Sequence, residues 1–178
     1  MALIVETGTG VTNANSYVSV AFADNYASGS LTATEWEALT IDTKEKLLIA
    51  ATRWLDQHAK WNGTKTFTTA PLPNNLRWPR KNVFDCDELP VGENTIPPGL
   101  MSAVCELAQF FINPENNPLR FSDRYGLKEL TVDVITLVFQ DSYNANASKY
   151  LPGLNTALCG LGRVVSANGA RGVPINKV

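Results

Sequence analysis

The first stretch of this sequence with residue types that could do chemistry is Leu76-Arg77-Trp78-Pro79-Arg80, in which arginines flank an aromatic–proline pair. Basic residues beside an aromatic ring can stack on nucleic-acid bases and contact phosphates, so Arg77, Trp78 and Arg80 are candidate DNA contacts. The alternative is that Trp78 fills the core while the arginines cap or pair at the surface. The shortness of the motif and a net charge of -2 favour this alternative.

Two loops have the composition of ion-binding sites. Gly8 and Gly10 form a G-x-G turn, but the third glycine and the Lys-Ser/Thr pair of a phosphate-binding loop are missing, so we expect no phosphate site. Asp85, Asp87 and Glu88 lie close together and could hold a cation. Their spacing does not match a calcium-binding loop, and a solvated loop is the better interpretation.

The residues that catalysis needs do not come together in the sequence. His58 is the one histidine, and it lies at the edge of an apolar helical face without a nucleophile or ligand set nearby. We therefore expect a packed or half-exposed structural histidine. No His, Cys and Asp residues have metal-ligand spacing, and no paired acids stand on an apolar helical face. The sequence predicts a protein that is not an enzyme, with no catalytic residue, metal or cofactor.

Cysteine usage and charge narrow the class of protein further. The three cysteines Cys86, Cys105 and Cys159 are far apart and include no CxxC pair. Cys105 and Cys159 lie in apolar helical patterns, so we expect small core residues in a reducing compartment. The net charge of -2 argues against a protein whose main task is gripping nucleic acid, although a local basic patch remains compatible. We expect no signal peptide and no membrane span.

The element around which the chain is organised is a helix predicted from Ile96 to Asn113. Pro97 or Pro98 can occupy the first helical position, and Asn113 should end the helix because it precedes a proline. Its apolar residues recur with helical spacing. They include Leu100, Val104, Leu107, Ala108 and Phe111. We expect a core helix whose excess apolar surface could also meet another subunit.

Other helices are predicted from their capping residues. Ser19 can cap a helix over residues 19–28. Thr34 and Glu37 form a candidate capping box for a second, short helix. Asp42, with Glu45 reaching back, predicts the start of a longer helix that runs past His58.

The later part of the chain mixes β and helical signals. Asn62-Gly63 predicts a tight turn. Residues 130–134 alternate in the manner of a half-buried strand, and residues 135–139 continue as an apolar β run. A last helix carries Leu154 and Leu158 on one face and ends near residues 160–162.

These elements predict a mainly α fold: a small helical bundle with a short β element, of the α+β class, with an extended C-terminal tail. Residues 1–162 are expected to form a single domain and residues 163–178 the tail. β-prone and basic side chains in the tail could add as a strand to a partner's sheet edge. The candidate partner-binding residues are Arg163, Val164, Val165, Arg171, Val173, Ile175 and Val178. The alternative is a frayed terminus.

Five landmarks over residues 2–112 resemble, in order and spacing, a family of tailed-phage and prophage proteins. They are the opening ALIVETGTGVTNANSYVS, the segment ATRWLD at 51–56, the turn WNG at 61–63, the motif WPR at 78–80, and a proline-started helix containing CELA at 105–108. The family is often labelled DnaT-like single-stranded DNA-binding protein. Its fold and gene context are similar to head–tail connector proteins, also called adaptor or head-completion proteins.

The resemblance implies a structural virion protein at the neck of the virion, made in the bacterial host cytoplasm. It would be a subunit of a ring, typically of twelve copies, that joins the portal vertex of a phage head to the tail and lines the DNA exit channel. The implied partners are further copies of the chain, the portal protein, a tail or tail-completion protein, and genomic double-stranded DNA that passes through without specific binding. No membrane is involved. The alternative is a single-stranded DNA-binding module, which would need a basic groove with stacking aromatics.

Overall fold

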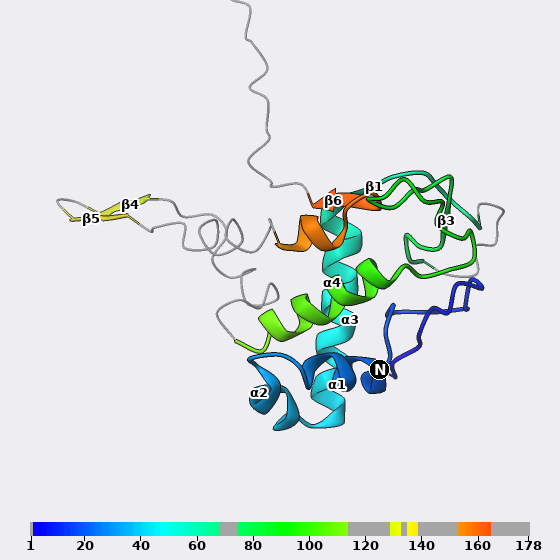
Figure 1. Cartoon of the computed structure of the whole chain (residues 1–178). Helices are drawn as coiled ribbons and strands as arrows, with labels where there is room; N and C mark the ends of the chain where they lie inside the picture. Colours follow the sequence, from blue (N-terminus) through cyan, green and yellow to red (C-terminus); the bar gives the residue numbers. More distant parts are fainter. Residues whose placement is uncertain (1, 68–74, 114–128, 133–134, 139–152, 165–178) are drawn as a thin grey trace, which may run out of the picture.

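The computed structural model describes residues 2–67, 75–113, 129–132, 135–138 and 153–164. The longest helix, α3, is upright in Figure 1, with α1 and α2 beside its first residues and the strands β1 and β6 beside its last. The helices are α1 (Val20–Ala27), α2 (Ala33–Glu37), α3 (Ile41–His58) and α4 (Pro98–Phe110). Residues 153–157 form a further helical turn.

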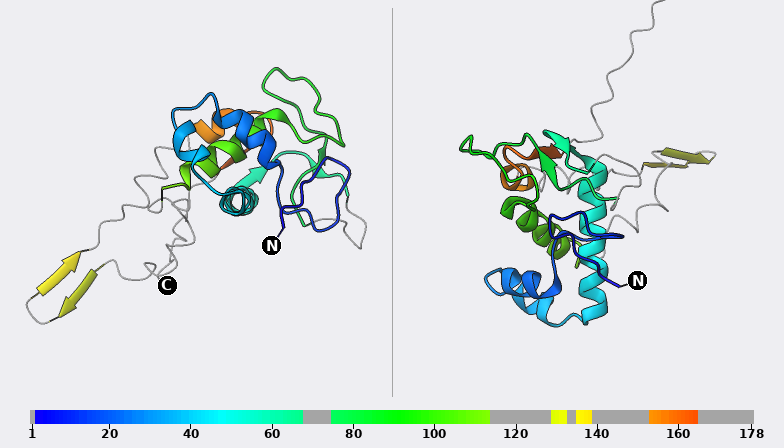
Figure 2. Two further views of the ribbon diagram at one scale, coloured as in Figure 1. Left: turned by 90° about the horizontal axis from the view of Figure 1, so that it is seen from below. Right: turned by 90° about the vertical axis from the view of Figure 1, so that its right-hand side faces the viewer.

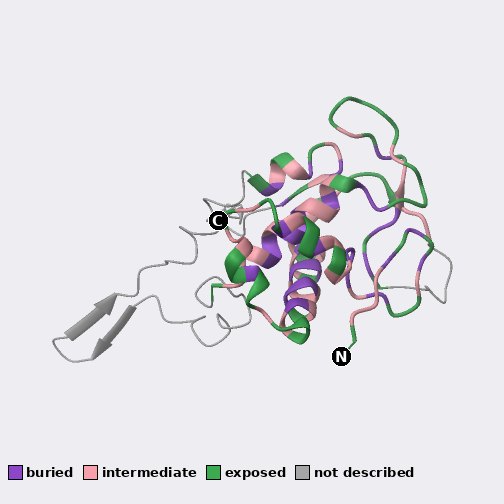
Figure 3. Ribbon diagram, turned by 60° about the horizontal axis from the view of Figure 1, so that its bottom comes forward, coloured by how far each residue is buried: buried purple, intermediate pink, exposed green. Residues whose placement is uncertain are grey.

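The predicted central helix is α4, which packs against both α3 and α1 (Figure 2). Pro97 has an extended backbone and Pro98 occupies the first helical position, as the sequence predicted. The predicted apolar face is confirmed. Leu100, Val104, Leu107, Ala108 and Phe111 are all buried. They contribute to a core shared with the inner face of α3, coloured purple in Figure 3.

Two polar side chains of α4, Glu106 and Gln109, hold the first two helices. The hydroxyl of Tyr26 donates to Oε1 of Glu106 at 3.1 Å. The hydroxyls of Ser30 and Thr32 both donate to Oε1 of Gln109, at 2.7 and 2.6 Å. The turn between α1 and α2 is therefore fastened to α4 by side chains as well as by apolar packing.

The N-cap predicted for α1 is correct, whereas the N-cap predicted for α3 is wrong. Ser19 caps α1 as expected, accepting a hydrogen bond from the amide of Phe22 at 3.1 Å. The predicted cap at Asp42 is wrong, because Thr40 has the extended backbone that a cap requires and its hydroxyl accepts from the amide of Thr43. Asp42 lies instead in the first turn of α3, where a negative charge is favourable.

The predicted capping box at Thr34 is also wrong. Helix α2 begins at Ala33 with Thr32 as its N-cap, so Thr34 already lies inside the helix. Thr32 makes no side-chain capping bond, because its hydroxyl is engaged with Gln109.

The described residues contain three antiparallel two-stranded ladders. The strands are β1 (Ala59–Trp61), β2 (Thr64–Lys65), β3 (Arg80–Lys81), β4 (Glu129–Val132), β5 (Ile135–Val138) and β6 (Gly162–Val164). They pair as β1 with β6, β2 with β3, and β4 with β5. The apolar run at 135–139 was expected to continue the strand before it, but β5 pairs back on β4, with Val132 opposite Ile135. The α+β class is thus confirmed.

The turn between β1 and β2 is the predicted Asn62-Gly63 turn. Gly63 has a φ of +63°, and a Cβ there would collide with the main-chain oxygen of Lys81. Glycine is therefore required both by conformation and by the close approach of β3. This turn brings the β1–β6 and β2–β3 ladders next to each other.

Candidate nucleic-acid interface

Trp78, the aromatic candidate for base stacking, is fully buried, with an exposed fraction of 0%. Its indole packs edge-on against Trp61, with ring centroids 5.9 Å apart. A ring without exposed surface offers no face to a base, so Trp78 is withdrawn as a stacking contact. The alternative interpretation, that Trp78 fills the core, is confirmed.

The segment around Trp78 is held by the buried Tyr17 and the half-buried Asp56, a pair that no sequence pattern singled out. The hydroxyl of Tyr17 donates to Oδ1 of Asp56 at 2.7 Å and accepts from the amides of Arg77 and Trp78 at 3.0 and 3.1 Å. Oδ2 of Asp56 accepts from the amide of Arg77 at 3.0 Å. Because these partners lie far apart in the chain, neither motif nor spacing could have revealed them.

Burial raises the pKa of both side chains in this pair. It raises the pKa of Asp56 to about 6, although the hydrogen bond from Tyr17 and the positive charges of Arg77 and Lys65 oppose the rise. It also raises the pKa of Tyr17 well above the ordinary value, with the adjacent Asp56 carboxylate adding to the effect. The pair therefore sits in a poorly solvated place beneath the Arg77–Arg80 segment.

Arg80 has a structural role in addition to its charge. Its Nε donates to the carbonyl of Asn62 at 2.6 Å, and its Nη2 donates to the carbonyl of Gly63 at 2.7 Å. Nη1 donates to the carbonyl of Arg77 at 3.2 Å. The guanidinium is thus locked over the β1–β2 turn, whereas the Arg77 side chain is exposed. DNA contact by either arginine stays a prediction.

Two cationic residues stand opposite each other in each of the β1–β6 and β2–β3 ladders. Lys60 on β1 stands directly opposite Arg163 on β6, and Lys65 on β2 stands directly opposite Arg80 on β3. Arg77 lies just before β3 and close enough to Lys65 and Arg80 to lower the pKa of both, after the larger effect of their burial. We call Lys60, Lys65, Arg77, Arg80 and Arg163 the basic strand cluster.

The acidic loop that follows β3 is organised by its own backbone. The Asp85 carboxylate accepts from the amides of Asp87 and Leu89, both at 2.9 Å. Asp87 and Glu88 are exposed, which confirms the interpretation as a solvated loop. Among the described residues, no group of three or more His, Cys, Asp or Glu is placed to hold a metal ion.

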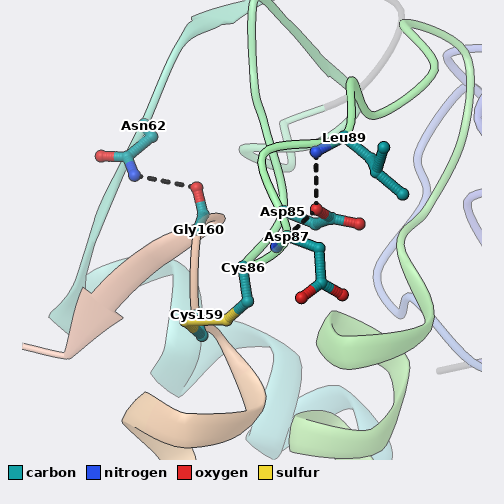
Figure 4. Close-up of a disulfide and its surroundings, with 7 residues drawn as sticks. All are labelled: Asn62, Asp85, Cys86, Asp87, Leu89, Cys159 and Gly160. Atoms are coloured by element: carbon teal, nitrogen blue, oxygen red, sulfur yellow. Dashed lines mark hydrogen bonds between the residues drawn. A yellow bond between two sulfur atoms is a disulfide. The ribbon is translucent and has the colours of Figure 1, made fainter.

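The same loop carries a disulfide that corrects the prediction for Cys159. Figure 4 shows Cys86 bonded to Cys159, with the Asn62 side chain donating to the carbonyl of Gly160 beside it. The Cα atoms of the two cysteines are 5.4 Å apart. Cys159 is exposed rather than a core residue, because Gly160 turns the chain there and packs on the backbone of Asp85. The expectation of a reducing compartment relied on unpaired cysteines and loses that support.

The two remaining candidates are structural. Ring atoms of His58 stack on Trp54 with centroids 4.4 Å apart, and its Nδ1 lies 2.8 Å from the carbonyl of Trp54, so the prediction of a structural histidine is confirmed. Cys105, in α4, is buried as predicted.

The glycine turn near the N-terminus is already occupied by a carboxylate. Oε1 of Glu6 accepts from the amides of Gly8 and Gly10, at 2.8 and 2.9 Å, and Oε2 accepts from the amide of Val11 at 2.8 Å. Both glycines have positive φ. The amides that a phosphate would need are therefore taken by the chain itself, in agreement with the expectation of no phosphate site.

A comparison of the sequence with models of protein families identifies the family of this chain. Residues 1–175 match the model of the family described as "Putative DnaT-like ssDNA binding protein". The chain belongs to this family. Searches of curated proteins and of solved structures found no match.

For this member of the DnaT-like family, the first two residues of the predicted tail lie in a strand. Arg163 and Val164 lie in β6, paired with Lys60 and Ala59, and Val164 is buried. These two residues belong to the folded part, because β1 offers them a backbone partner that local sequence cannot show. The other predicted tail contacts lie outside the described residues. They are Val165, Arg171, Val173, Ile175 and Val178.

None of the helices in the described ranges of this DnaT-like chain combines the length and the apolar character needed to cross a bilayer.

Proposed function

We propose that this protein is a structural virion protein, a subunit of a ring adaptor that joins the portal vertex of a phage head to the tail and lines the DNA exit channel. The observation that carries the proposal is the placement of its exposed large hydrophobic side chains. Leu31 and Ile41 lie beside α2, and Phe84 and Leu89 lie in the loop after β3, near the other end of α3. Identical subunits that close into a ring must join through two different patches, head to tail.

The charges beside these patches bear on how strongly free subunits would associate. Exposed Glu35 and Glu37 accompany Leu31, and exposed Asp87 and Glu88 accompany Leu89. Like charges facing each other across an interface oppose association and are screened by salt. We therefore expect free subunits to associate weakly and to form the ring on the portal.

A single-stranded DNA-binding module is the second candidate, and two observations favour it. One is the description of the family, and the other is the basic strand cluster. Against it, two large aromatic side chains that could stack on bases, Trp36 and Trp78, are buried. Within the described part of the chain, this candidate would depend on the exposed aromatic side chain of Phe84.

Electron microscopy of the purified protein mixed with portal protein tests the proposal. We expect a ring of subunits added to the portal, and light scattering of the free protein should show monomer or a monomer–oligomer mixture that shifts toward oligomer as salt is raised. A tight, two-fold symmetric free dimer would contradict the ring. So would a single-strand affinity tighter than about micromolar at physiological salt that is lost in Phe84→Ala, because non-specific binding is normally weaker than that.

A further inference from the structure

The disulfide between Cys86 and Cys159 is open to the surrounding solution. Both cysteines are exposed, and they join the loop after β3 to the turn before β6, as Figure 4 shows. Exposed disulfides are reached and reduced by small thiols, whereas structural ones in secreted proteins typically resist reduction. This bond is therefore placed to open and close with the redox state of the solution.

The turn on the Cys159 side is anchored independently of the disulfide. The amide of Asn62 donates to the carbonyl of Leu161, and the Asn62 side chain donates to the carbonyl of Gly160, both at 2.9 Å. The side chains of Leu158 and Leu161 are buried in the core. This turn should keep its place when the disulfide opens.

The loop on the Cys86 side is held by hydrogen bonds within itself. The Asp85 carboxylate accepts from the amides of Asp87 and Leu89, and the Asp85 amide donates to the carbonyl of Leu89 at 2.9 Å. The disulfide, together with the packing of Gly160 on the backbone of Asp85, fastens the loop to the turn before β6. Reduction removes the covalent part of that attachment.

The same loop carries two apolar side chains that the proposed ring would use. Phe84 is 55% exposed and Leu89 is 60% exposed, and Cys86 lies between them in the sequence. A surface that is already fixed in shape loses less conformational entropy on binding than one that must first be ordered. The oxidised loop is therefore better suited than the reduced loop to contact a neighbouring subunit.

We propose that the Cys86–Cys159 disulfide is a redox switch for association between copies of this chain. The oxidised form, with the loop of Phe84 and Leu89 fixed, associates more tightly than the dithiol form. This inference rests on the proposed function, in which these side chains join one subunit to the next. Small thiols in a reducing compartment open the bond, and an oxidising solution closes it.

Opening and closing of the bond are thiol–disulfide exchanges. A thiolate of a small dithiol attacks one sulfur, and the other sulfur leaves as a thiolate that takes up a proton. The second thiol of the reagent then displaces the protein from the mixed disulfide, so the reagent becomes a cyclic disulfide and the chain gains two electrons and two protons. Glutathione disulfide drives the reverse reaction and is reduced to two molecules of glutathione. Cys105 does not compete, because burial raises the pKa of its thiol to about 12.

The test compares the full-length protein oxidised by glutathione disulfide with the same protein kept reduced by a dithiol. Light scattering over a series of protein concentrations measures self-association, with salt raised to screen the acidic side chains beside Leu89. Electron microscopy with portal protein measures ring formation by each form. Alkylation after unfolding, followed by mass spectrometry, should label one cysteine in the oxidised form and three in the reduced form.

Three variants separate the disulfide from other causes. Cys86→Ser/Cys159→Ser is fixed in the open form. Cys105→Ala is the matched control, which removes a thiol but keeps the disulfide. Phe84→Ser/Leu89→Ser keeps the disulfide but removes the apolar side chains of the loop. Thermal melts show whether each variant and each redox form is folded.

We expect oxidised wild type and oxidised Cys105→Ala to associate about tenfold more tightly than reduced wild type, since the reduced loop must be ordered at the interface. The open variant should behave like reduced wild type in either reagent. Phe84→Ser/Leu89→Ser should associate weakly and to the same extent in both redox states.

Several outcomes would overturn the inference. If the two forms of wild type associate equally, or the dithiol form more tightly, the bond is not this switch, although a ring seen on the portal would leave the proposed function intact. An unfolded dithiol form would make the bond a structural crosslink only. A redox dependence that persists in Phe84→Ser/Leu89→Ser would place the responsive surface outside this loop. If neither form assembles, alone or on the portal, the proposed function fails and the inference fails with it.

Discussion

Charged side chains are arranged differently at the two ends of α3. At the helical end, Nζ of Lys44 lies 2.8 Å from Oδ1 of Asp24, and Lys46 pairs with Asp42 at 2.6 Å. At the strand end, Lys60 stands opposite Arg163 with no such compensation among the described residues. At the helical end two lysines therefore have carboxylate partners, whereas at the strand end Lys60 and Arg163 have no ion pair with another described residue.

The two ends are also fastened differently. The turn after α1 is tied to α4 by side chain–side chain bonds, such as those from Ser30 and Thr32 to Gln109. At the strand end, side chains bind main-chain groups, as Tyr17 does with the amides of Arg77 and Trp78. Strands this short have few ladder bonds of their own, so side chains and a disulfide must fix their backbone.

The largest effect should come from removing Trp78 from beneath the strands. Trp78→Ala should lower the free energy of unfolding by about 3–5 kcal/mol, because it empties a fully buried site. Arg77→Ala is the matched control, since only the backbone of Arg77 is used inside, and it should cost no more than about 0.5 kcal/mol. Denaturant titration measures both; equal losses would show that the Arg77 side chain also holds the strand end.

Loss of the disulfide should weaken the strand end before the helical end. The bond closes a loop of 73 residues, for which chain entropy predicts about 4 kcal/mol of stabilisation. Cys86→Ser/Cys159→Ser should therefore lower the melting temperature and speed hydrogen exchange in β1 and β6 more than in α1. A reductant should reproduce this change in wild type and have no effect on the variant. Faster exchange in α1 alone would refute the division into two ends.

The two ends should respond to pH with opposite sign. Asp56 has a folded pKa of about 6 and an unfolded pKa near 3.9, so the folded state holds its proton more tightly. Its contribution to stability is therefore fully present below about pH 4 and is lost as the pH rises past 6, by about 3 kcal/mol in total.

Asp24 does the reverse, because the hydrogen bond from Lys44 lowers its pKa, and its smaller contribution is lost as the pH falls. Chemical denaturation across this range, compared with Asp56→Asn, checks the difference. The variant should lack the fall between pH 4 and 6; an unchanged profile in Asp56→Asn would place the titrating group elsewhere.

The smallest effects should differ in sign for the same substitution. Lys44→Met removes an ion pair and a cation held 5.6 Å from the centroid of the Trp36 ring, and should cost about 1 kcal/mol. Lys60→Met relieves the repulsion with Arg163 and should gain a few tenths of a kcal/mol. Precise thermal melts at low salt resolve the two, and destabilisation by both would mean that Lys60 has a stabilising partner.

The local signals in the sequence predicted the helical end well and the strand end poorly. Pro98, the apolar spacing of α4 and the Ser19 cap act within one turn of helix, so α1 and α4 were found near their true positions. Strand β6 was missed because its partner β1 is distant in the chain, and two glycines there suggested only the end of a helix. The basic strand cluster depends on cross-strand register, which no spacing rule reveals.

The same reasoning explains why Tyr17 and Asp56 were not predicted as a pair. Tyr17 precedes the helix predicted from the Ser19 cap, and Asp56 lies in the helix predicted to run past His58, so each segment was assigned from its own local pattern. Their contact exists because the Arg77–Arg80 segment passes over the end of α3 and needs acceptors for its amides. The need for these acceptors depends on the tertiary fold, so no local segment of sequence reveals it.

The glycine turn occupied by Glu6 has a consequence for how such turns are interpreted in other sequences. A glycine turn with free amides is a common reason to suspect a nucleotide or phosphate ligand. Here the ligand is covalently part of the protein, two residues upstream of the first glycine, so the short connecting chain gives it a high effective concentration at the turn. A carboxylate at that offset is thus a warning of self-occupancy, and it can be checked by eye in any sequence that contains E-x-G-x-G.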